Sequence, residues 1–288
     1  MISVRDLSSQ YGDTIALQNV SFDLAEGDFL TIFGGDDAGK TTLLRILMGF
    51  RTRYSGTVKL WGKRPNRLTR EQQSRLRFLP DDIIWEGHLT GEEYLSYIQR
   101  CSEVYDGEYQ EELCRRFGVV LEEGLLDTSY QNNKLVQMIG ALCVRPKLIL
   151  LDEPSTYLET EVYRILCELL QEHCRQGGGV LVTEKSYETA REYSSRCIYL
   201  KEGKIAVNAR VTHPDIRCKA VTVRGGQEEY LNQYLSRFIC ERKGTRTYLY
   251  KGDMKTLAAL MYHAECADWI VEELTLTEEL EGNYARWK

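Results

Sequence analysis

The feature that most constrains the fold lies at residues 34–41, where Gly-Gly-Asp-Asp-Ala-Gly-Lys-Thr fits the pattern G-x-x-x-x-G-K-[ST]. An apolar run at residues 29–33 precedes it, and a helical pattern at residues 42–48 follows it. A phosphate-binding loop requires this strand–loop–helix context, because backbone N–H groups and the positive end of the helix then face the phosphate. The sequence therefore predicts an α/β fold with a phosphate loop.

Each position of this loop has an expected role. Lys40 offers a point charge to the β- and γ-phosphate oxygens, and Thr41 supplies a hydroxyl ligand to Mg²⁺. Backbone N–H groups of the loop wrap the β-phosphate. The expected nucleotide-binding residues of this segment are Gly34, Gly35, Asp36, Asp37, Ala38, Gly39, Lys40, Thr41 and Thr42.

A second motif supplies acidic groups. Residues 147–151 end in an apolar run that suits a buried parallel strand, and Asp152-Glu153-Pro154 follows it. Alone, two acids after such a run are usually just the polar end of a strand. Beside a phosphate loop we expect Asp152 to ligate Mg²⁺ and Glu153 to lie next to the attacking water.

Composition excludes several classes of protein. The chain has 288 residues, of which 43% are hydrophobic and 28% charged, as in ordinary globular proteins. The net charge of −6 argues against a primary nucleic-acid binder, because phosphate contact needs a basic face. No apolar run reaches about 18 residues, and the first ten residues do not fit a signal peptide. Nine scattered cysteines predict reduced thiols and no structural metal site.

The hydrophobic pattern predicts two regions. Residues 1–210 alternate strands and helices, and a helical zone at about residues 90–145 opens with a capping box at Thr90 and Glu93. Residues 211–288 predict a small α+β region. Its expected strands are residues 219–223, 246–250 and 269–271, and its expected helices are residues 227–238, 253–263 and 277–284.

With both motifs in place, residues 1–210 resemble the ATP-binding subunits of ABC transporters. The resemblance implies an α/β P-loop NTPase core of ABC type, with a helical subdomain and a small C-terminal α+β region. It implies that Tyr11 stacks on adenine and that Asp81, in the Q-loop segment 78–81, ligates Mg²⁺. The tail, residues 273–280, is similar to the end of subunits that serve exporters of the ABC-2 type.

Three further segments correspond to motifs of that family. Residues 128–132 stand at the signature, where Ser129 would donate to the ATP held by the opposite subunit. Residues 155–159 stand at the D-loop. Residues 180–184 form the strand that ends, in the family, at a switch histidine.

Departures from the family pattern are as informative as the matches. The departing residues are Asp37 for a loop glycine, Asp81 for the Q-loop glutamine, Tyr130 and Gln131 for signature glycines, Glu159 for the D-loop aspartate, and Glu184 for the switch histidine. Lys40 is then the one clear cation among six acids, which predicts weak nucleotide binding. Glu184, counted with Lys40 and Glu153 as catalytic, is expected to be the most damaging change, because an ionised carboxylate has no proton to donate. Glu184→His should therefore raise the rate.

Two functions from different classes follow. The first is a cytoplasmic ATPase that dimerises and drives a separate membrane permease, lying on the inner face of the cell membrane through that permease. The alternative is a regulatory partner subunit that holds ATP and hydrolyses little. The retained Lys40, Thr41, Asp152 and Glu153 favour the first function, and the altered motifs favour the second.

The resemblance also implies a second ATP-binding subunit. A heterodimer with an intact partner is favoured over a homodimer, because this chain lends a poor signature. A nucleic-acid-linked ABC ATPase is a distant third function, since such proteins usually carry two cassettes in one chain.

Overall fold

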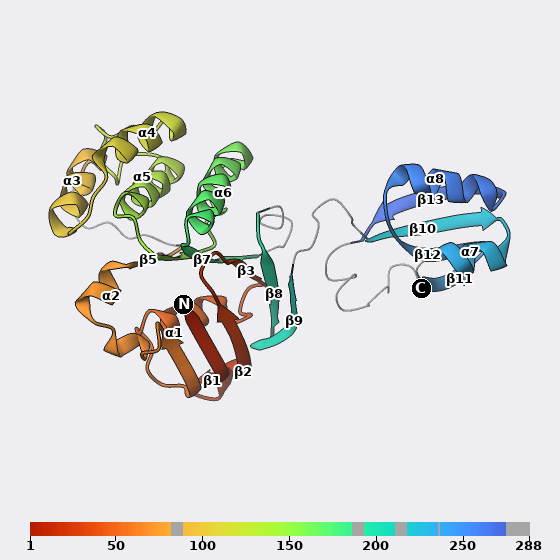
Figure 1. The fold of residues 1–288 in the computed structure, drawn as a ribbon, viewed down its shortest axis with the longest axis horizontal. Coiled ribbons are helices and arrows are strands. Elements are labelled where there is room, and N and C mark those ends of the chain that lie inside the picture. Colours follow the sequence, from red (N-terminus) through yellow and green to blue (C-terminus); the bar gives the residue numbers. More distant parts are fainter. Residues whose placement is uncertain (82–88, 186–192, 211–217, 236, 275–288) are drawn as a thin grey trace. The chain divides into compact units, whose positions relative to one another are not determined.

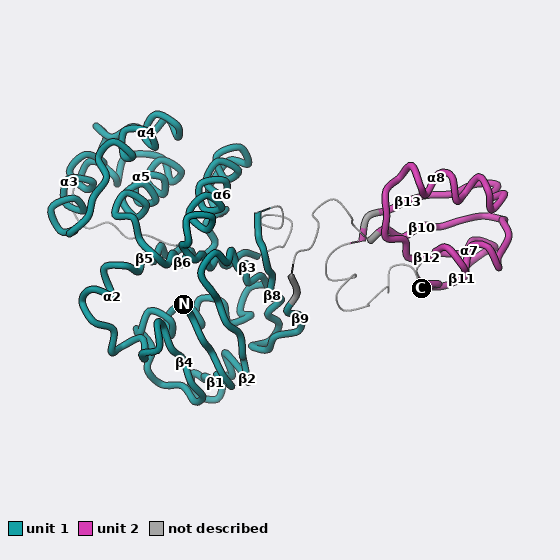
Figure 2. The backbone as a smooth tube through the Cα atoms, in the orientation of Figure 1, with its two compact units in different colours: residues 1–211 teal, residues 212–288 magenta. Residues whose placement is uncertain are grey.

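The structure is a computed structural model that describes residues 1–81, 89–185, 193–210, 218–235 and 237–274. The chain divides into two compact units, Met1–Val211 and Thr212–Lys288 (Figure 2). Each unit has its own hydrophobic core.

The described part of the first unit contains two sheets (Figure 1). The larger has the order β5-β6-β7-β3-β8-β9 and is parallel except at its edge pair β8–β9. Its strands are β3 (Phe29–Phe33), β5 (Leu76–Leu79), β6 (Leu148–Asp152), β7 (Gly179–Glu184), β8 (Arg196–Lys201) and β9 (Lys204–Arg210). The mostly parallel sheet expected from the sequence is thus confirmed.

The second sheet is antiparallel. The sequence pattern predicts its strands but does not show that they form a sheet of their own. Its order is β2-β1-β4. The strands are β1 (Ile2–Tyr11), β2 (Thr14–Leu24) and β4 (Ser55–Leu60).

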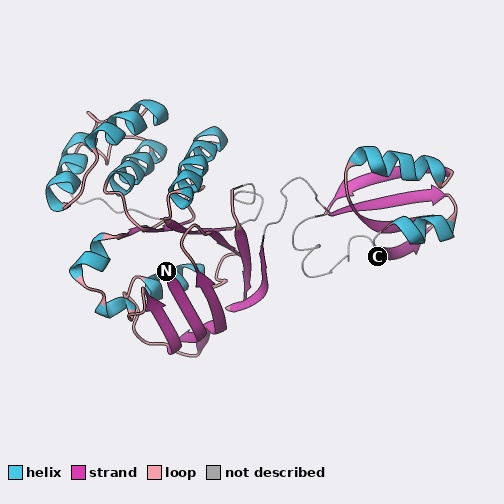
Figure 3. Cartoon of the chain, viewed as in Figure 1, coloured by secondary structure: helices cyan, strands magenta, loops and turns pink. Residues whose placement is uncertain are grey.

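Helices lie on both faces of the larger sheet. Figure 3 shows α3–α6 on one side, and α1 with the antiparallel sheet on the other. The helices are α1 (Lys40–Leu47), α2 (Arg70–Ser74), α3 (Gly91–Cys101), α4 (Gly107–Phe117), α5 (Tyr130–Cys143) and α6 (Thr160–Arg175), with a 3₁₀ turn at Pro65–Arg67. The predicted capping box is confirmed, because Thr90 N donates to Glu93 Oε2 at 2.9 Å and Glu93 N donates to Thr90 Oγ1 at 3.2 Å.

Strand β6 shows how this layering follows from the sequence. Side chains alternate between the two faces of a strand, so an apolar run can fill two cores. Leu148 and Leu150 enter the core shared with α1 and the antiparallel sheet, whereas Ile149 and Leu151 enter the core shared with α5 and α6. The strand therefore ends between two packed layers and holds Asp152 in a fixed place.

The second unit has the element order β-α-β-β-α-β, a ferredoxin-like topology. Its antiparallel sheet has the order β11-β12-β10-β13. The elements are β10 (Cys218–Gly225), α7 (Glu228–Tyr234), β11 (Arg237–Arg242), β12 (Thr245–Lys251), α8 (Met254–His263) and β13 (Cys266–Glu273). Val221, Tyr248, Leu231 and Leu257 pack in one core, so both helices cover the same face.

One predicted helix in this unit is wrong at its C-terminal end. The helix expected over residues 227–238 ends at Tyr234, and Phe238 belongs to β11. The Phe238 ring packs edge-on against Tyr248 of β12, with centroids 5.5 Å apart. Cross-strand pairing thus overrides the local helical pattern. The helix predicted at residues 277–284 lies outside the described residues.

Candidate functional site

The phosphate loop joins β3 to α1 and is held against β7. Strand β3 pairs with β7 in parallel, with Phe33 opposite Glu184. The N–H of Gly34 then donates to the carbonyl of Glu184 at 3.2 Å. Gly39 has a φ of 102°, and a Cβ there would lie 2.3 Å from the carbonyl oxygen of Ala16, so only glycine fits before α1.

Asp37 occupies a backbone conformation that favours glycine. Its φ is 61°, in the left-handed region that aspartate tolerates better than most other residues. This left-handed backbone explains why the family that the sequence resembles has a glycine at this position. The aspartate adds a negative charge and a strained backbone to the loop.

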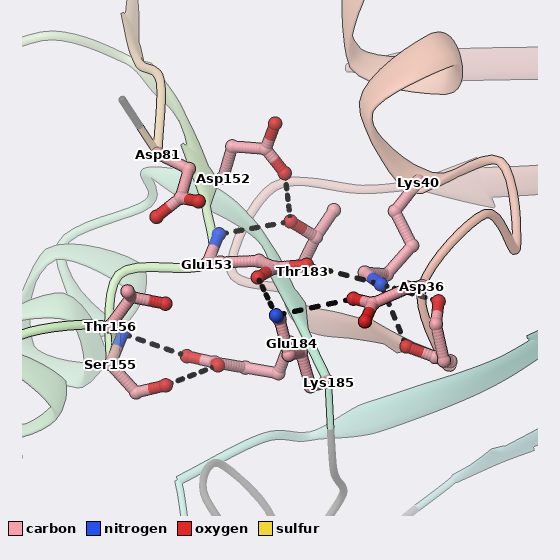
Figure 4. Close-up of polar contacts among 12 residues, drawn as sticks. Asp36, Lys40, Asp81, Asp152, Glu153, Ser155, Thr156, Thr183, Glu184 and Lys185 are labelled. Atoms are coloured by element: carbon pink, nitrogen blue, oxygen red, sulfur yellow. Dashed lines mark hydrogen bonds and ion pairs between the residues drawn. The ribbon is translucent and has the colours of Figure 1, made fainter. Parts of the chain in front are cut away.

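Lys40 carries the central contacts of the site (Figure 4). The residue is only 4% exposed, and its Nζ donates to the carbonyls of Gly34 at 2.7 Å and Gly35 at 2.9 Å. The same Nζ lies 3.1 Å from Oε1 of Glu153. The structure thus brings the predicted phosphate-binding cation and the predicted base together.

Strand β7 fixes Asp152, the last residue of β6, and Glu153, which follows it. Oδ1 of Asp152 accepts from Thr183 Oγ1 at 2.5 Å. The N–H of Glu153 donates to both the carbonyl and Oγ1 of Thr183, each at 3.1 Å. Both acids are buried, so their carboxylates are held in place beside the phosphate loop.

The predicted magnesium ligands differ in their surroundings. Thr41, at the start of α1, and Asp152 offer oxygen ligands of the kind that Mg²⁺ prefers. Oδ1 of Asp81 instead lies 3.5 Å from Nζ of Lys134. Within the described ranges, no group of three or more His, Cys, Asp or Glu side chains forms a metal cluster. The oxygen donors of Thr41 and Asp152 are suited to Mg²⁺.

Two lysines that the sequence analysis missed reach the site, so the expectation of Lys40 as the one clear cation is wrong. Nζ of Lys134, on α5, donates to the carbonyls of Glu153 at 2.9 Å and Thr156 at 3.1 Å. Nζ of Lys185 lies 3.2 Å from Oδ1 of Asp36 and 3.8 Å from Oε2 of Glu153. The sequence could have indicated Lys134, because it directly precedes the mostly apolar residues 135–143 and a buried charge needs partners.

Lys134 is a buried cation. It is 5% exposed, and burial lowers its pKa, while the charge of Asp81 acts in the opposite direction. Its ammonium links helix α5 to the segment after β6, through the carbonyl of Glu153, and to Asp81 after β5. The six predicted acids therefore do not face Lys40 alone.

Glu184 points away from the phosphate loop (Figure 4). It is 1% exposed, and its carboxylate accepts from the N–H and Oγ of Ser155, at 3.2 and 2.5 Å, and from the hydroxyl of Tyr163 at 2.9 Å. Burial raises the pKa of Glu184 to about 7, although these hydrogen bonds act to lower it. The charge expected beside the γ-phosphate thus lies on the Ser155 side of β7.

Tyr11 lies next to the start of α1. The guanidinium of Arg51 covers one face of its ring, 3.7 Å from the centroid. Burial raises the pKa of the hydroxyl, but hydrogen bonds with Thr42 and Arg45 outweigh that effect and lower it. Stacking of adenine on Tyr11 stays a prediction. The adenine would lie on the face of the ring opposite Arg51.

The signature segment contacts the D-loop segment of the same chain. Ser129 caps α5, where its Oγ accepts from the N–H of Asn132 at 3.1 Å. Tyr130, 76% exposed, stacks on Tyr157 with centroids 5.1 Å apart. Oε1 of Gln131 accepts from the N–H of Glu159 at 2.8 Å. Among the described contacts, none joins Ser129 to the phosphate loop of its own chain.

Comparison with known proteins gives consistent matches. A family model described as ABC transporter matches residues 17–156. The chain is 31% identical over 247 residues to the aliphatic sulfonates import ATP-binding protein SsuB 1 of Agrobacterium fabrum, covering 82% of this chain and 84% of that protein. It is 26% identical over 277 residues to the Nod factor export ATP-binding protein I of Burkholderia orbicola, covering 90% and 88%.

Other matches are shorter or concern the fold alone. The chain is 27% identical over 220 residues to an uncharacterized ABC transporter ATP-binding protein, y4mK of Sinorhizobium fredii. This match covers 72% of this chain but only 44% of the length of y4mK. The dimeric ATP-binding cassette MJ0796, solved in a post-hydrolysis state with ADP and phosphate, shares the fold. The two structures superpose with a TM-score of 0.64 at 22% sequence identity, and the match covers 74% of this chain and 100% of the MJ0796 chain. In the part of the chain that is described, every helix is too short or too polar to cross a membrane.

Proposed function

Since the chain belongs to the family of ATP-binding subunits of ABC transporters, we propose that it binds MgATP at residues 34–42 and hydrolyses it slowly to drive a separate permease. One observation carries this proposal. The buried ammonium of Lys40 lies on the carbonyls of the phosphate loop and on the carboxylate of Glu153. An ammonium held by acceptors that phosphate oxygens can replace is poised to bind a nucleotide.

In the proposed complex the phosphates lie over the first turn of α1, whose N–H groups have no partners within the helix. Lys40 exchanges the loop carbonyls and Glu153 for phosphate oxygens. Tyr11 borders the adenine. The signature serine of the second subunit would complete the site, as Ser129 of this chain would do for the partner's site.

Glu153 then acts as the general base. Once Lys40 turns to the phosphates, the Glu153 carboxylate loses that ion pair and can accept a proton from the attacking water. The two hydrogen bonds from its N–H to Thr183 hold its backbone in place. Lys134 holds the same backbone from the other side, through the carbonyl of Glu153.

Mg²⁺ would be held by Thr41 and Asp152, with Asp81 as the third predicted ligand. The bound ion supplies positive charge to the phosphate oxygens. Asp152 keeps one carboxylate oxygen on Thr183, which orients it. Asp81 would have to share its carboxylate with Lys134.

We further propose a heterodimer with a more intact ATP-binding subunit, attached through its permease to the inner face of the membrane. Tyr130 and Gln131 place side chains where close approach of N–H groups to a phosphate needs none. The names of relatives include both import and export, so the proposal concerns the ATP-driven step and not the cargo.

Steady-state hydrolysis by the purified chain, alone and with its permease and partner, tests these proposals. We expect slow hydrolysis alone and a loss of at least about a hundredfold in Glu153→Gln, the usual contribution of a general base. Replacing both Tyr130 and Gln131 by glycine should raise hydrolysis by the chain alone, whereas Tyr157→Ala, which removes only the stacked ring, should not. Full permease-coupled hydrolysis by this chain alone would refute the heterodimer. Binding without hydrolysis in every assembly would favour the regulatory function.

A further inference from the structure

The carboxylate of Glu153 lies between two ammonium groups (Figure 4). Nζ of Lys40 is 3.1 Å from Oε1, and Nζ of Lys185 is 3.8 Å from Oε2. Lys185 also reaches Asp36 of the phosphate loop, at 3.2 Å from Oδ1. It therefore connects the loop that would hold the phosphates to the group that would activate water.

The sheet explains why Lys185 lies there. Strands β3 and β7 are parallel neighbours, so the residues that follow Phe33 and Glu184 leave the sheet side by side. Successive side chains of a strand point in opposite directions. Glu184, the last residue of β7, is turned toward Ser155 and Tyr163, whereas Lys185, the next residue, reaches Asp36 of the phosphate loop.

Lys185 is exposed, whereas Lys40 is buried, so Lys185 can change partners at little cost. Its side chain is 60% exposed, and that of Asp36 is also largely exposed. An exposed ion pair contributes about 0–1 kcal/mol, so leaving Asp36 costs little. The hydrogen bond with Asp36 raises the pKa of Lys185, which therefore remains a cation at neutral pH.

The geometry points to Lys185 as a second phosphate-binding cation, which contacts the terminal phosphate of ATP on the other side of Glu153 from Lys40. This inference rests on the proposed function. An ammonium offers three donors and a full charge, which the carboxylate of Glu184 cannot offer. ADP lacks the phosphate that Lys185 would touch, so this residue would make the site prefer ATP. When both lysines bind phosphate, Glu153 loses both ion pairs and becomes available as a base.

Calorimetric titration of the full chain with two Mg²⁺-loaded nucleotides tests the inference without relying on activity. The ligands are ADP and the non-hydrolysable β,γ-imido analogue of ATP. Lys185→Ala should weaken binding of the analogue by about tenfold, as expected for one lost charge-assisted contact, and should change ADP affinity less than about twofold. Lys185→Arg keeps the charge and should retain most of the preference. Lys59→Ala, which removes an exposed lysine of β4, should change neither affinity.

An equal loss for both nucleotides, or no loss for either, in Lys185→Ala would overturn the inference. Lys40→Ala, titrated in parallel, separates this failure from failure of the proposed function. If Lys40→Ala abolishes binding of both nucleotides while Lys185→Ala changes neither, only the role of Lys185 falls. If Lys40→Ala leaves both affinities unchanged, the proposed nucleotide site itself is wrong.

Discussion

The hydroxyl of Tyr163 donates to Oε1 of Glu184 over 2.9 Å, which joins helix α6 to the end of strand β7. The N–H and hydroxyl of Ser155 donate to the same carboxylate. Glu184 thus fixes the segment that directly follows the proposed base, Glu153. Its place in the structure is that of a positioning residue, facing the D-loop segment and not the phosphate loop.

The buried carboxyl of Glu184 predicts a pH-dependent stability. Burial raises its pKa from 4.5 to about 7, so between these values the unfolded chain loses the proton that the folded chain still holds. Stability therefore falls as pH rises through this window, by about 3 kcal/mol for this group. Glu184→Gln keeps one acceptor oxygen for the N–H of Ser155 and the hydroxyl of Tyr163, lets its amide donate to Oγ of Ser155, and removes the titration. Urea unfolding at about pH 5 and about pH 7.5 should show the difference in wild type only; the same pH dependence in both proteins would contradict this.

Glu184→His is now expected to be harmful, although the motif alone predicts a gain. The imidazole cannot accept from Ser155 and Tyr163 as a carboxylate does, and buried donors left unpaired cost about 1–3 kcal/mol. We expect lower stability in urea and no increase in kcat. A higher kcat with unchanged stability would show that the side chain works at the phosphate.

Asp37→Gly should both stabilise the chain and tighten MgATP binding. Glycine removes the left-handed strain at a φ of 61°, which costs about 1 kcal/mol, and removes a negative charge from the loop. Asp37→Asn is the matched control, because it removes the charge and keeps the side chain. Both variants should lower Kd for MgATP by calorimetry, and only Asp37→Gly should raise the urea midpoint. Equal stabilisation by both would mean that charge, and not backbone strain, sets the effect.

Lys134 should couple energetically to Asp81. Lys134→Met leaves the carbonyls of Glu153 and Thr156 without their donor and Asp81 without its cation, which should cost about 2–4 kcal/mol. In an Asp81→Asn background the loss should be smaller by about 1 kcal/mol, because one partner is already neutral. A double-mutant cycle in urea measures this difference. Losses of equal size in both backgrounds would show that the ion pair contributes nothing.

Local patterns were sufficient to predict the phosphate loop and the acids after β6. The motif Gly34 to Thr41 and the pair Asp152-Glu153 are each contiguous in sequence, and the strands beside them are mostly apolar. Each motif lies at the carboxyl end of its strand, so the position of the strand determines the position of the motif.

Contacts between distant segments could not be predicted in this way. Lys134 lies 19 residues from Glu153, and nothing in the periodicity of α5 shows where its ammonium ends. The direction of Glu184 depends on Tyr163, a residue of another helix. The strand at Phe238 depends on its partner Tyr248, which a helical pattern does not reveal.

Calorimetric titration of MgATP into the wild-type chain and into Lys40→Ala tests the central claim most directly. Lys40→Met, which fills more of the same buried space, guards against an effect of lost packing, and circular dichroism checks that both variants fold. The account predicts saturable binding by the wild type and none by either variant, because each removes the ammonium held on Gly34, Gly35 and Glu153. Unchanged affinity in a folded variant would contradict it.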